Sequence, residues 1–538
     1  MHLLNSFDWS IIFAFFALTL AIGLWCAKKS GESSAEYFLS GRTMPWWLLG
    51  FSMVATTFSA DTPNLVTDIV RQDGVSGNWC WWAFLLTGML TVFIYAKLWR
   101  RTGVLTDIEF YELRYSGPWA AFLRGFRAIY LGVFFNIMIM ATVSLAAIKI
   151  GGIMLGLSPV HSIFWASLIT VVFCSLGGFR GVLLTDFVLF NIAMIGAIGA
   201  AYYSLQHPAV GGLSGMLAQI RSNPALAGKL NIFPDFSNME TLIPLLIIPI
   251  AVQWWSVWYP GAEPGGGGYI AQRMLAAKNE KHATGATLFF NVAHYALRPW
   301  PWIIVALCSL IVYPDIQSIV RAFPNADSTK ILNDAAYPAM LSFLPHGFLG
   351  LVLASLTAAY MSTISTHLNW GSSYVVNDYW KRFHNPGASE SELVWVGRIS
   401  TVLMMLVAGV IALWMQSALD SFQILLSIGA GTGLLFILRW FWWRINPLSE
   451  LTAMVVSFVL ALLFKFSPLG AGLKGWQQLV LSVVITTICW VAVTMLSRPA
   501  DKETLRRFVS IANPGGPGWQ KVIKDAEAEG NPIQFQHG

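Results

Sequence analysis

Runs of about twenty apolar residues recur along almost the whole chain, and they restrict its fold more than any other feature. A helix needs roughly 20 apolar residues to cross the hydrocarbon core of a bilayer. Only 11% of the residues are charged, whereas an average soluble domain carries about 25%. The sequence therefore predicts an all-α polytopic membrane protein.

The apolar runs divide the chain into about 13 predicted transmembrane helices. Their positions follow from hydropathy and from the polar stretches between them. We place them at residues 8–27, 46–70, 78–99, 123–148, 158–177, 181–204, 241–270, 283–312, 346–377, 396–416, 421–443, 449–466 and 477–496.

The charged residues give this map an orientation. No Lys or Arg precedes the first apolar run, and Lys28 and Lys29 follow it. With the N-terminus outside, most of the 33 Lys and Arg residues fall in inner loops or the C-terminal tail, as the positive-inside rule expects. Arg298 instead lies within a predicted span. We expect a plasma (inner) membrane protein with a cytoplasmic C-terminus. The lipid bilayer is the expected partner, and nucleic acid is not.

Two of the predicted spans are interrupted, and they lie five spans apart. The first contains Thr56, Thr57, Ser59, Asp61 and Thr62 before Pro63, and the second contains "WYPGAEPGGGG" at 258–268. Broken helices at matching positions of two halves indicate an inverted-repeat transporter with its site near the midplane. The alternative is that Pro and Gly only kink these helices. We expect the four glycines to leave backbone groups free for binding.

This pattern predicts a division of the chain. An extra N-terminal helix and inner loop precede the first five-helix repeat, an outer loop separates the repeats, and two helices and a cytoplasmic tail follow. The ranges are 1–45, 46–204, 205–240, 241–443, 444–497 and 498–538. The connection at 100–122 is predicted to be an inner interfacial helix, and 205–240 and 313–345 are predicted to be outer loops.

A stripe of small and hydroxyl residues follows one face of the span at 346–377. Ala359, Ser362, Thr363 and Thr366 share this face, with Ser365 at its edge. Hydroxyl oxygens are suitable ligands for hard cations. Close helix packing explains the same residues without any ion, and spacing alone leaves both interpretations open.

Asp186 is a carboxylate within a predicted membrane helix. Insertion scales place the cost of such a residue at roughly 2.5–3.5 kcal/mol at the helix centre, so it needs a compensating interaction. That interaction is either a bound cation or a contact near the inner end of the helix, with water or Arg180. The sequence does not decide between them.

The sequence gives no support for an enzyme and little for a solute sensor. We find no paired-His motif, no G-x-S-x-G and no evident carboxylate dyad, so we expect no enzyme activity and no cofactor. The short tail has no room for a kinase or receiver domain, which counts against a solute sensor. A channel on the same fold and proton coupling through Asp186 or Glu263 remain alternatives.

Four stretches resemble the sodium:solute symporter family, which includes sodium/sugar, sodium/proline and sodium/sialic acid cotransporters. They are "YFLSGRTMPWWLLGFSMVATTFSA" (37–60), "LGGFRGVLLTDF" (176–187), "YIAQRMLAAKN" (269–279) and "AAYMSTIST" with "NDYWKRF" (358–383). With the span pattern, the resemblance covers most of residues 8–443. It implies ten core helices in a leucine-transporter-like, five-plus-five inverted repeat.

The resemblance also implies where sodium, the expected coupling ion, binds. One site lies between the first and eighth core helices. Its matching ligands are the carbonyls of Ala55, Phe58 and Ala359 and the hydroxyls of Ser362 and Thr363. Some members have a second sodium site, and the matching residues here are Asp186, Ser365 and Thr366.

The predicted function is sodium-coupled import of a small polar solute by alternating access. Sugar carriers of the family have an Asn-and-Tyr arrangement at the second break, which this sequence lacks. In the seventh core helix, His294 stands where other members often carry a cation. A sugar or polyol remains our first expectation, and an organic acid, amino acid or nucleoside is the alternative. The candidate solute-binding residues are Thr57, Asp61, Thr62, Trp258, Tyr259, Glu263 and His294.

Overall fold

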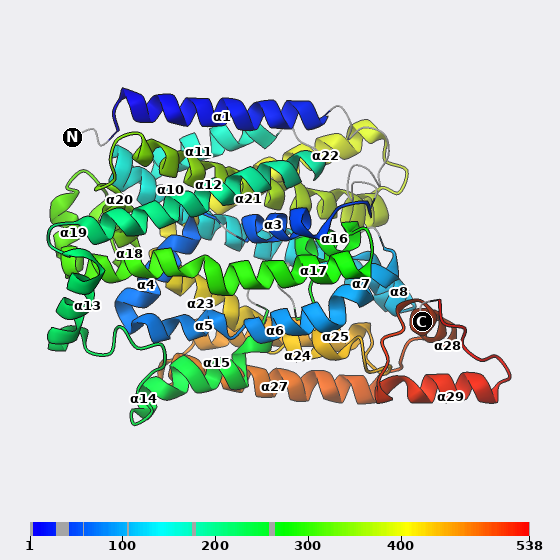
Figure 1. Ribbon diagram of the computed structural model, residues 1–538. Coiled ribbons are helices and arrows are strands. Elements are labelled where there is room, and N and C mark those ends of the chain that lie inside the picture. The colour runs from blue at the N-terminus through cyan, green and yellow to red at the C-terminus, as the bar shows by residue number, and fades with distance from the viewer. Residues whose placement is uncertain are drawn as a thin grey trace.

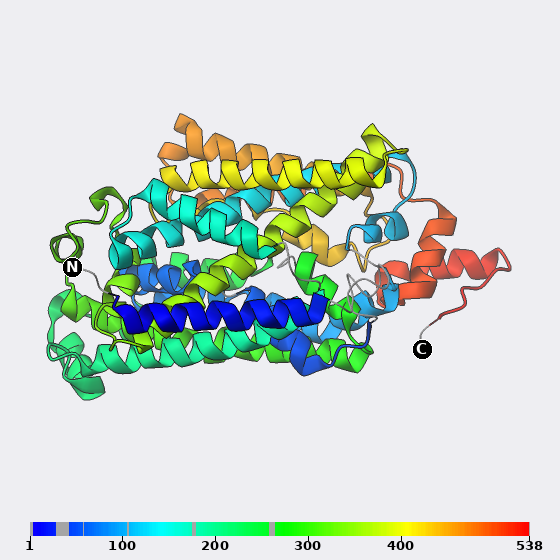
Figure 2. The same ribbon diagram turned by 90° about the horizontal axis from the view of Figure 1, so that it is seen from above.

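The computed structural model describes residues 4–27, 42–57, 59–104, 107–174, 179–257 and 264–536. Its long helices run side by side in one bundle (Figures 1 and 2). The main helices are α1 (Ser6–Ala27), α3 (Trp46–Thr56), α4 (Asp61–Asp73), α6 (Leu85–Leu90), α7 (Ala96–Thr102), α8 (Glu109–Arg114), α9 (Pro118–Ile129), α10 (Asn136–Leu155), α11 (Pro159–Cys174), α12 (Phe179–Gln206), α13 (Gly212–Ser222), α14 (Met239–Leu242), α15 (Ile248–Ala251), α16 (Gly268–Ala276), α17 (Glu280–Asn291), α18 (Pro299–Val312), α19 (Ile316–Ala322), α20 (Ala336–Leu341), α21 (Phe348–Ser373), α22 (Glu390–Trp414), α23 (Ala418–Gly429), α24 (Gly433–Leu438), α25 (Pro447–Phe466), α27 (Gly475–Leu496), α28 (Lys502–Ala512) and α29 (Gln520–Ala528).

The predicted all-α membrane architecture is confirmed. Each predicted span overlaps helix, and within the described ranges the one β-type contact is an isolated bridge between Met44 and Ala277. Eight helices in the same ranges are long and apolar enough to cross a membrane. Apolar helices such as Trp46–Thr56 and Ala418–Gly429 are shorter. The number of thirteen crossings stays a prediction.

The predicted outer and inner connections lie at opposite ends of the bundle. The N-terminus, α13 and α19 occupy one end in Figure 1, and α8, α28, α29 and the C-terminus occupy the other. Figure 2 shows the same separation of the termini. The connections predicted to be inner therefore share one end of the bundle, and those predicted to be outer share the other.

The first predicted interruption is present. Helix α3 ends at Thr56 and α4 begins at Asp61. Thr57 closes α3 by returning its hydroxyl to the carbonyls of Met53 and Val54, at 3.0 and 2.9 Å. Asp61 stands in the first turn of α4, where the positive end of the helix dipole favours an acid.

The second interruption begins earlier than the sequence suggests. The helical segment that starts at α14 ends with α15 at Ala251, and a short 3-10 turn, Gln253–Trp255, follows. Pro244 and Pro249 remove backbone donors from this segment, which weakens it before the glycines are reached. The carbonyl of Trp254 is released from the helix and accepts a hydrogen bond from the Thr87 hydroxyl at 2.5 Å. Helix resumes with α16 at Gly268.

The glycine run is bound more tightly than we expected. Gly265 and Gly266 have φ values of +88° and +82°, which only glycine adopts without strain. The Gly265 carbonyl accepts a hydrogen bond from Trp99 Nε1 at 2.8 Å, and the Gly268 N–H donates to Asp107 Oδ2 at 2.9 Å. The expectation that these backbone groups are free for a ligand is wrong at both positions.

The break packs against a second glycine-rich segment, "GAGTG" at 429–433, which connects α23 to α24. A Cβ on Gly433 would lie 1.3 Å from the Trp255 carbonyl oxygen, and one on Gly429 would lie 1.7 Å from that of Val257. Only residues without a side chain allow the two backbones this approach. The segment after α15 is therefore supported by the α23–α24 junction.

The inner connection differs from the predicted interfacial helix. Phe110, Tyr111 and Arg114 of α8 are buried against protein, and α28 of the tail and Trp519 cover this region. An interfacial helix would have buried its apolar face in lipid.

Candidate functional site

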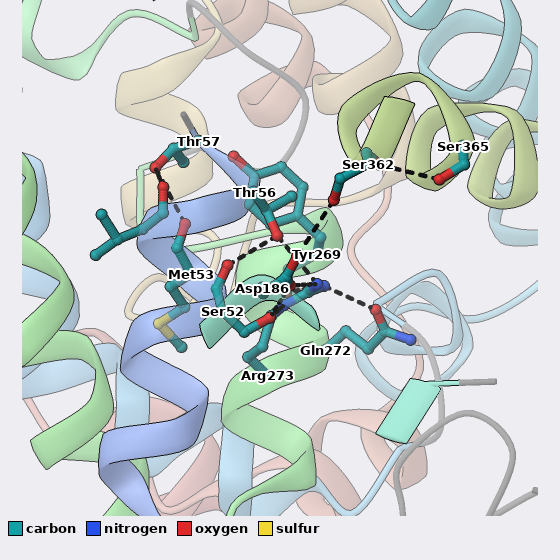
Figure 3. A network of polar contacts seen from close by, with 11 residues as sticks. Ser52, Met53, Thr56, Thr57, Asp186, Tyr269, Gln272, Arg273, Ser362 and Ser365 are labelled. Carbon is teal, nitrogen blue, oxygen red and sulfur yellow. Dashed lines mark hydrogen bonds and ion pairs between the residues drawn. The ribbon is translucent and has the colours of Figure 1, made fainter. Parts of the chain in front are cut away.

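Asp186 is completely buried and lies where three other helices meet (Figure 3). Ser52 of α3 donates its hydroxyl to Asp186 Oδ2 at 2.7 Å, and Ser362 of α21 donates to Oδ1 at 3.2 Å. Arg273 of α16 places Nη2 at 4.0 Å from Oδ2. The carboxylate thus links α12 to both halves of the predicted core.

Arg273 extends this network to the end of the first broken helix. Its Nε donates to the Ser52 hydroxyl and its Nη2 to the Thr56 hydroxyl, both at 3.2 Å. Figure 3 shows the guanidinium beside Asp186 and these hydroxyls. Arg273 is a cationic partner that we did not predict for Asp186. The predicted contact with Arg180 is untested, because the side chain of Arg180 lies outside the described part of the chain.

The hydroxyl stripe faces this region from α21. Ser362 contacts Asp186, and Thr363 lines a cavity beside Thr56 and Thr57. Thr363 is 2% exposed, and its hydroxyl has no hydrogen-bond partner among the described residues. A buried polar atom normally finds a partner, so this oxygen is available to a ligand. Ala359 is buried on the same face.

The second predicted sodium set is only partly gathered. Ser365 donates its hydroxyl to the Ser362 carbonyl at 3.1 Å, so it points along α21 (Figure 3). Ser365 and Thr366 are both half-buried. The hydroxyl that contacts Asp186 is that of Ser362, a member of the first predicted set.

A cavity opens at the interruption between α3 and α4. It is lined by hydroxyls, charged groups and apolar side chains from five or more helices. Thr57, Asp61, Thr62 and His294 of the predicted solute-binding set line it, together with Thr56, Ser59, Leu65, Val66, Trp81, Ile139, Thr142, Val143, Arg298, Thr363, Ala418, Phe422 and Leu425. A concave site with a few converging polar groups is typical of a small-molecule site.

His294 and Arg298 form one wall of the cavity and lie one helical turn apart. The helix between α17 and α18 widens to a π-turn over Val292–Leu297, and the Arg298 N–H reaches the Ala293 carbonyl at 3.0 Å. Pro299 and Pro301 follow and lack N–H donors, which explains the altered ladder. Such π-turns are frequent at functional sites.

The contacts of His294 define its tautomer. Arg298 Nη2 lies 3.3 Å from His294 Nε2, and an Arg can only donate, so Nε2 is an acceptor. A neutral ring then carries its hydrogen on Nδ1, which faces the Thr57 hydroxyl at 3.3 Å. Arg298 Nη1 also donates to the Thr57 carbonyl at 3.1 Å, which satisfies a carbonyl released at the end of α3.

Sequence reasoning missed the role of Arg298. We expected His294 to replace the cation that the family often has at this position. The structure instead brings an arginine, Arg298, into the cavity one turn later. The signal was present, because Arg298 lies within a predicted span at a position where a charge is costly. Four predicted site residues, Phe58, Trp258, Tyr259 and Glu263, lie outside the described residues.

A model of the sodium:solute symporter family matches residues 37–457. The chain is 25% identical over 520 residues to the sodium/glucose cotransporter of Vibrio parahaemolyticus, covering 93% of this chain and 92% of the other. It is 28% identical over 488 residues to human sodium/myo-inositol cotransporter 2, covering 85% and 69% of the two chains.

The fold has a solved counterpart. A Na⁺-coupled sialic acid symporter, determined in a substrate-bound outward-open state, aligns with a TM-score of 0.71 and 20% identity. The alignment covers 92% of this chain and 99% of that one. At this identity the likeness is one of fold.

Proposed function

The chain belongs to the sodium:solute symporter family, and from this premise we propose that it imports a small neutral polyhydroxylated solute, a sugar or polyol, together with sodium. It is a membrane transporter and not an enzyme. The identity of the solute and the residues that bind solute and ion are the parts we propose here. The observation that carries the proposal is the cavity at the break between α3 and α4, where a few hydroxyls and charged groups converge among apolar side chains.

The chemistry of the cavity suits a neutral solute with several hydroxyls. Asp61 and Arg298 carry opposite formal charges, and His294 is neutral in the tautomer described above. A neutral solute adds no unpaired charge to this buried site. Thr57, Ser59 and Thr62 can donate or accept, which matches hydroxyl groups, and Trp81 adds an aromatic surface. The named solutes of the relatives, glucose and myo-inositol, are of this class.

We assign the first sodium to the carbonyls of Ala55, Phe58 and Ala359 and the hydroxyls of Ser362 and Thr363. The unpartnered Thr363 hydroxyl supports this assignment. Ser362 supports it too, because a hydroxyl that donates its hydrogen to Asp186 keeps its lone pairs for a cation. Sodium is a hard cation that takes such oxygen ligands.

The second sodium is proposed at Asp186, Ser365 and Thr366, with a competing explanation beside it. Arg273 lies 4.0 Å from Asp186, so the carboxylate already has one cationic neighbour. A sodium ion there shares Asp186 with Arg273 or displaces it. One coupled sodium ion therefore has the stronger support.

Coupling follows from which elements the two ligands join. Sodium bound between the end of α3 and α21 holds the first broken helix against its neighbour, which completes the cavity for the solute. Rocking of one helix bundle against the other then exposes both ligands to the opposite side. We propose repeats at 46–204 and 241–443 and a plasma (inner) membrane location with the N-terminus outside.

An organic acid is the second candidate. Arg298 Nε is buried without a hydrogen-bond partner among the described residues. A carboxylate on the solute would satisfy that donor, since charge-assisted hydrogen bonds to arginine are strong. Amino acids and nucleosides are not favoured by a specific contact.

Uptake by purified protein in proteoliposomes separates these candidates. Radiolabelled glucose, galactose, myo-inositol, lactate and proline are each offered with an inward sodium gradient and with an equal choline gradient. We expect sodium-dependent uptake of a sugar or polyol. Sodium-dependent uptake restricted to lactate would favour the organic-acid carrier, and uptake of sugar that ignores sodium would contradict symport.

A further inference from the structure

The C-terminal tail is folded onto the end of the bundle that bears α8 (Figure 1). Phe508 of α28 and Trp519 before α29 are both buried, and their rings lie 5.4 Å apart. Trp519 Nε1 donates to the Trp440 carbonyl at 2.8 Å. A buried Trp in a polar tail is an anchor, since burial of its ring stabilises the docked state.

The anchor binds two elements at once. The Phe508 ring lies 5.9 Å from that of Phe110 on α8 and 5.8 Å from that of Trp440 after α24. The Arg114 guanidinium sits over Trp519 at 4.9 Å and donates to the Arg439 carbonyl at 2.9 Å. Arg114 is therefore enclosed between the tail and the end of α24.

Polar contacts extend the junction along the same connection. Arg507 Nη2 donates to the Glu112 carbonyl at 3.2 Å, and the Asp501 N–H donates to the Ser116 hydroxyl at 3.0 Å. The tail thus contacts both α8 and the turn that follows it, which limits how far this connection can move.

Asp107, two residues before α8, joins two core segments that we expect alternating access to separate. Its Oδ2 accepts the Gly268 N–H at 2.9 Å, at the start of α16 after the second break. Its Oδ1 accepts the Tyr374 hydroxyl at 2.6 Å, at the end of α21. Opening this end moves the helices around the two breaks, to which α16 belongs, against the helices around α21, and it lengthens at least one of these bonds.

We propose that the C-terminal tail is a brace that holds this end of the transporter closed. Trp519 and Phe508 fix α8, α8 fixes Asp107, and Asp107 ties α16 to α21. Trp519 is a positioning residue in this account and contacts neither ion nor solute. Loss of the anchor shifts the balance toward the conformation open at the α8 end. The predicted change in sodium affinity rests on the proposed function. The predicted change in distance across this end of the bundle does not.

The direct test measures a distance across this end of the bundle. Spin labels are placed at Lys278, just after α16, and at Lys381, beyond Tyr374, in a background without the native cysteines; both positions are exposed. Double electron–electron resonance is recorded for the parent, for Trp519→Ala and for Trp519→Phe. Glu527→Ala, an exposed site on α29, is the matched control.

We expect Trp519→Ala to increase the ratio of the longer-distance to the shorter-distance population about tenfold, with the parent distribution kept by Trp519→Phe and Glu527→Ala. In uptake, a tenfold shift from evenly populated conformations raises the half-saturating sodium concentration about fivefold and lowers that of efflux about twofold. If Trp519→Ala only destabilises the protein, its melting temperature and maximal transport rate fall. The half-saturating sodium concentrations of uptake and of efflux then stay unchanged.

A cleavable form covers the case in which Trp519→Ala does not fold. Gly515 and Gly516 are exposed and have open space around them, so a protease site there cuts the tail of protein that is already assembled. Unchanged distances in both Trp519→Ala and cut protein would overturn the brace. Absence of sodium-dependent uptake by the parent would instead refute the proposed function and leave the distance result to decide the brace.

Discussion

Asp186 shows how one buried residue can have two competing roles. It accepts hydrogen bonds from Ser52 and Ser362 and lies 4.0 Å from Arg273. An ion ligand has to exchange its partner during each cycle, whereas a structural ion pair does not. Its network of fixed partners favours the structural role.

Asp186→Asn tests that role. Removing one charge leaves Arg273 buried without its counter-charge, and breaking a buried pair costs about 3–5 kcal/mol of unfolding free energy. We expect a large loss of thermal stability in detergent, with Asp235→Asn in an exposed loop as the unchanged control. Preserved stability with one fewer sodium ion per solute would make Asp186 an ion ligand.

The Ser362→Ala/Thr363→Ala double variant tests the first sodium site. Each hydroxyl that contacts a charged group contributes about 1.5–3 kcal/mol, so we expect the half-saturating sodium concentration to rise at least tenfold. Thr357→Ala is the control on the same helix, because its hydroxyl bonds the Leu353 carbonyl. The measurement is initial uptake rate against sodium concentration. Equal sodium dependence in all three proteins would exclude these ligands.

Arg298→Lys tests the wall of the cavity. Lysine keeps the charge but loses the fixed fork that joins the Thr57 carbonyl to His294. We expect KM for the solute to rise about tenfold, while the half-saturating sodium concentration changes by less than about twofold. That solute effect is about 1.4 kcal/mol, the contribution of one hydrogen bond. Arg321→Lys in an exposed connection is the control. A larger effect on sodium than on solute would place Arg298 in coupling.

At the scale of elements, the two breaks depend on specific close contacts. The α23–α24 glycines admit the carbonyls of Trp255 and Val257, and no other residue type would leave that space. Helix α23 also supplies Ala418, Phe422 and Leu425 to the cavity wall. The second break is therefore held from outside rather than being loose because it contains glycine.

Gly433→Ala should disrupt this contact. Its methyl group would meet the Trp255 carbonyl oxygen at 1.3 Å, and such overpacking costs about 1–3 kcal/mol or more. We expect transport to be lost or severely reduced together with thermal stability. Gly472→Ala has nothing within 4 Å of the added atom and serves as the control. Wild-type transport by Gly433→Ala would show that the two segments are not packed this way.

The sequence predicted the first break closely but placed the second too late. Polar residues and Pro63 lie at the end of α3 itself, so the neighbouring sequence is sufficient to predict the first break. The segment at Val252–Val257 leaves its helix before any glycine, and its supports, Thr87 and the "GAGTG" stretch, are distant in sequence. Contacts of that kind are not encoded in a single hydrophobic run.

At the scale of the whole molecule, composition was the most reliable guide. Apolar runs predicted the helical segments because a bilayer demands them, and the excess of Lys and Arg predicted which connections share an end. The docked tail could not be predicted, since Trp519 stands among polar residues and looks like a surface aromatic. Its burial depends on Trp440 and Arg114, which lie far earlier in the chain.

The driving force is sufficient for accumulation. One sodium ion that crosses 100 mV down a tenfold gradient releases about 3.7 kcal/mol. That supports a solute ratio of roughly 500 between the two sides. A second ion would square the ratio, so the measured limit of accumulation also reports the number of ions.

The most direct test of sodium-driven symport imposes each gradient separately on proteoliposomes that carry the purified protein and the solute found in the uptake panel. We predict accumulation above equilibrium only with an inward sodium gradient, increased by an inside-negative potassium diffusion potential, and unaffected by a pH gradient alone. Accumulation that follows the pH gradient in the absence of sodium would contradict the account.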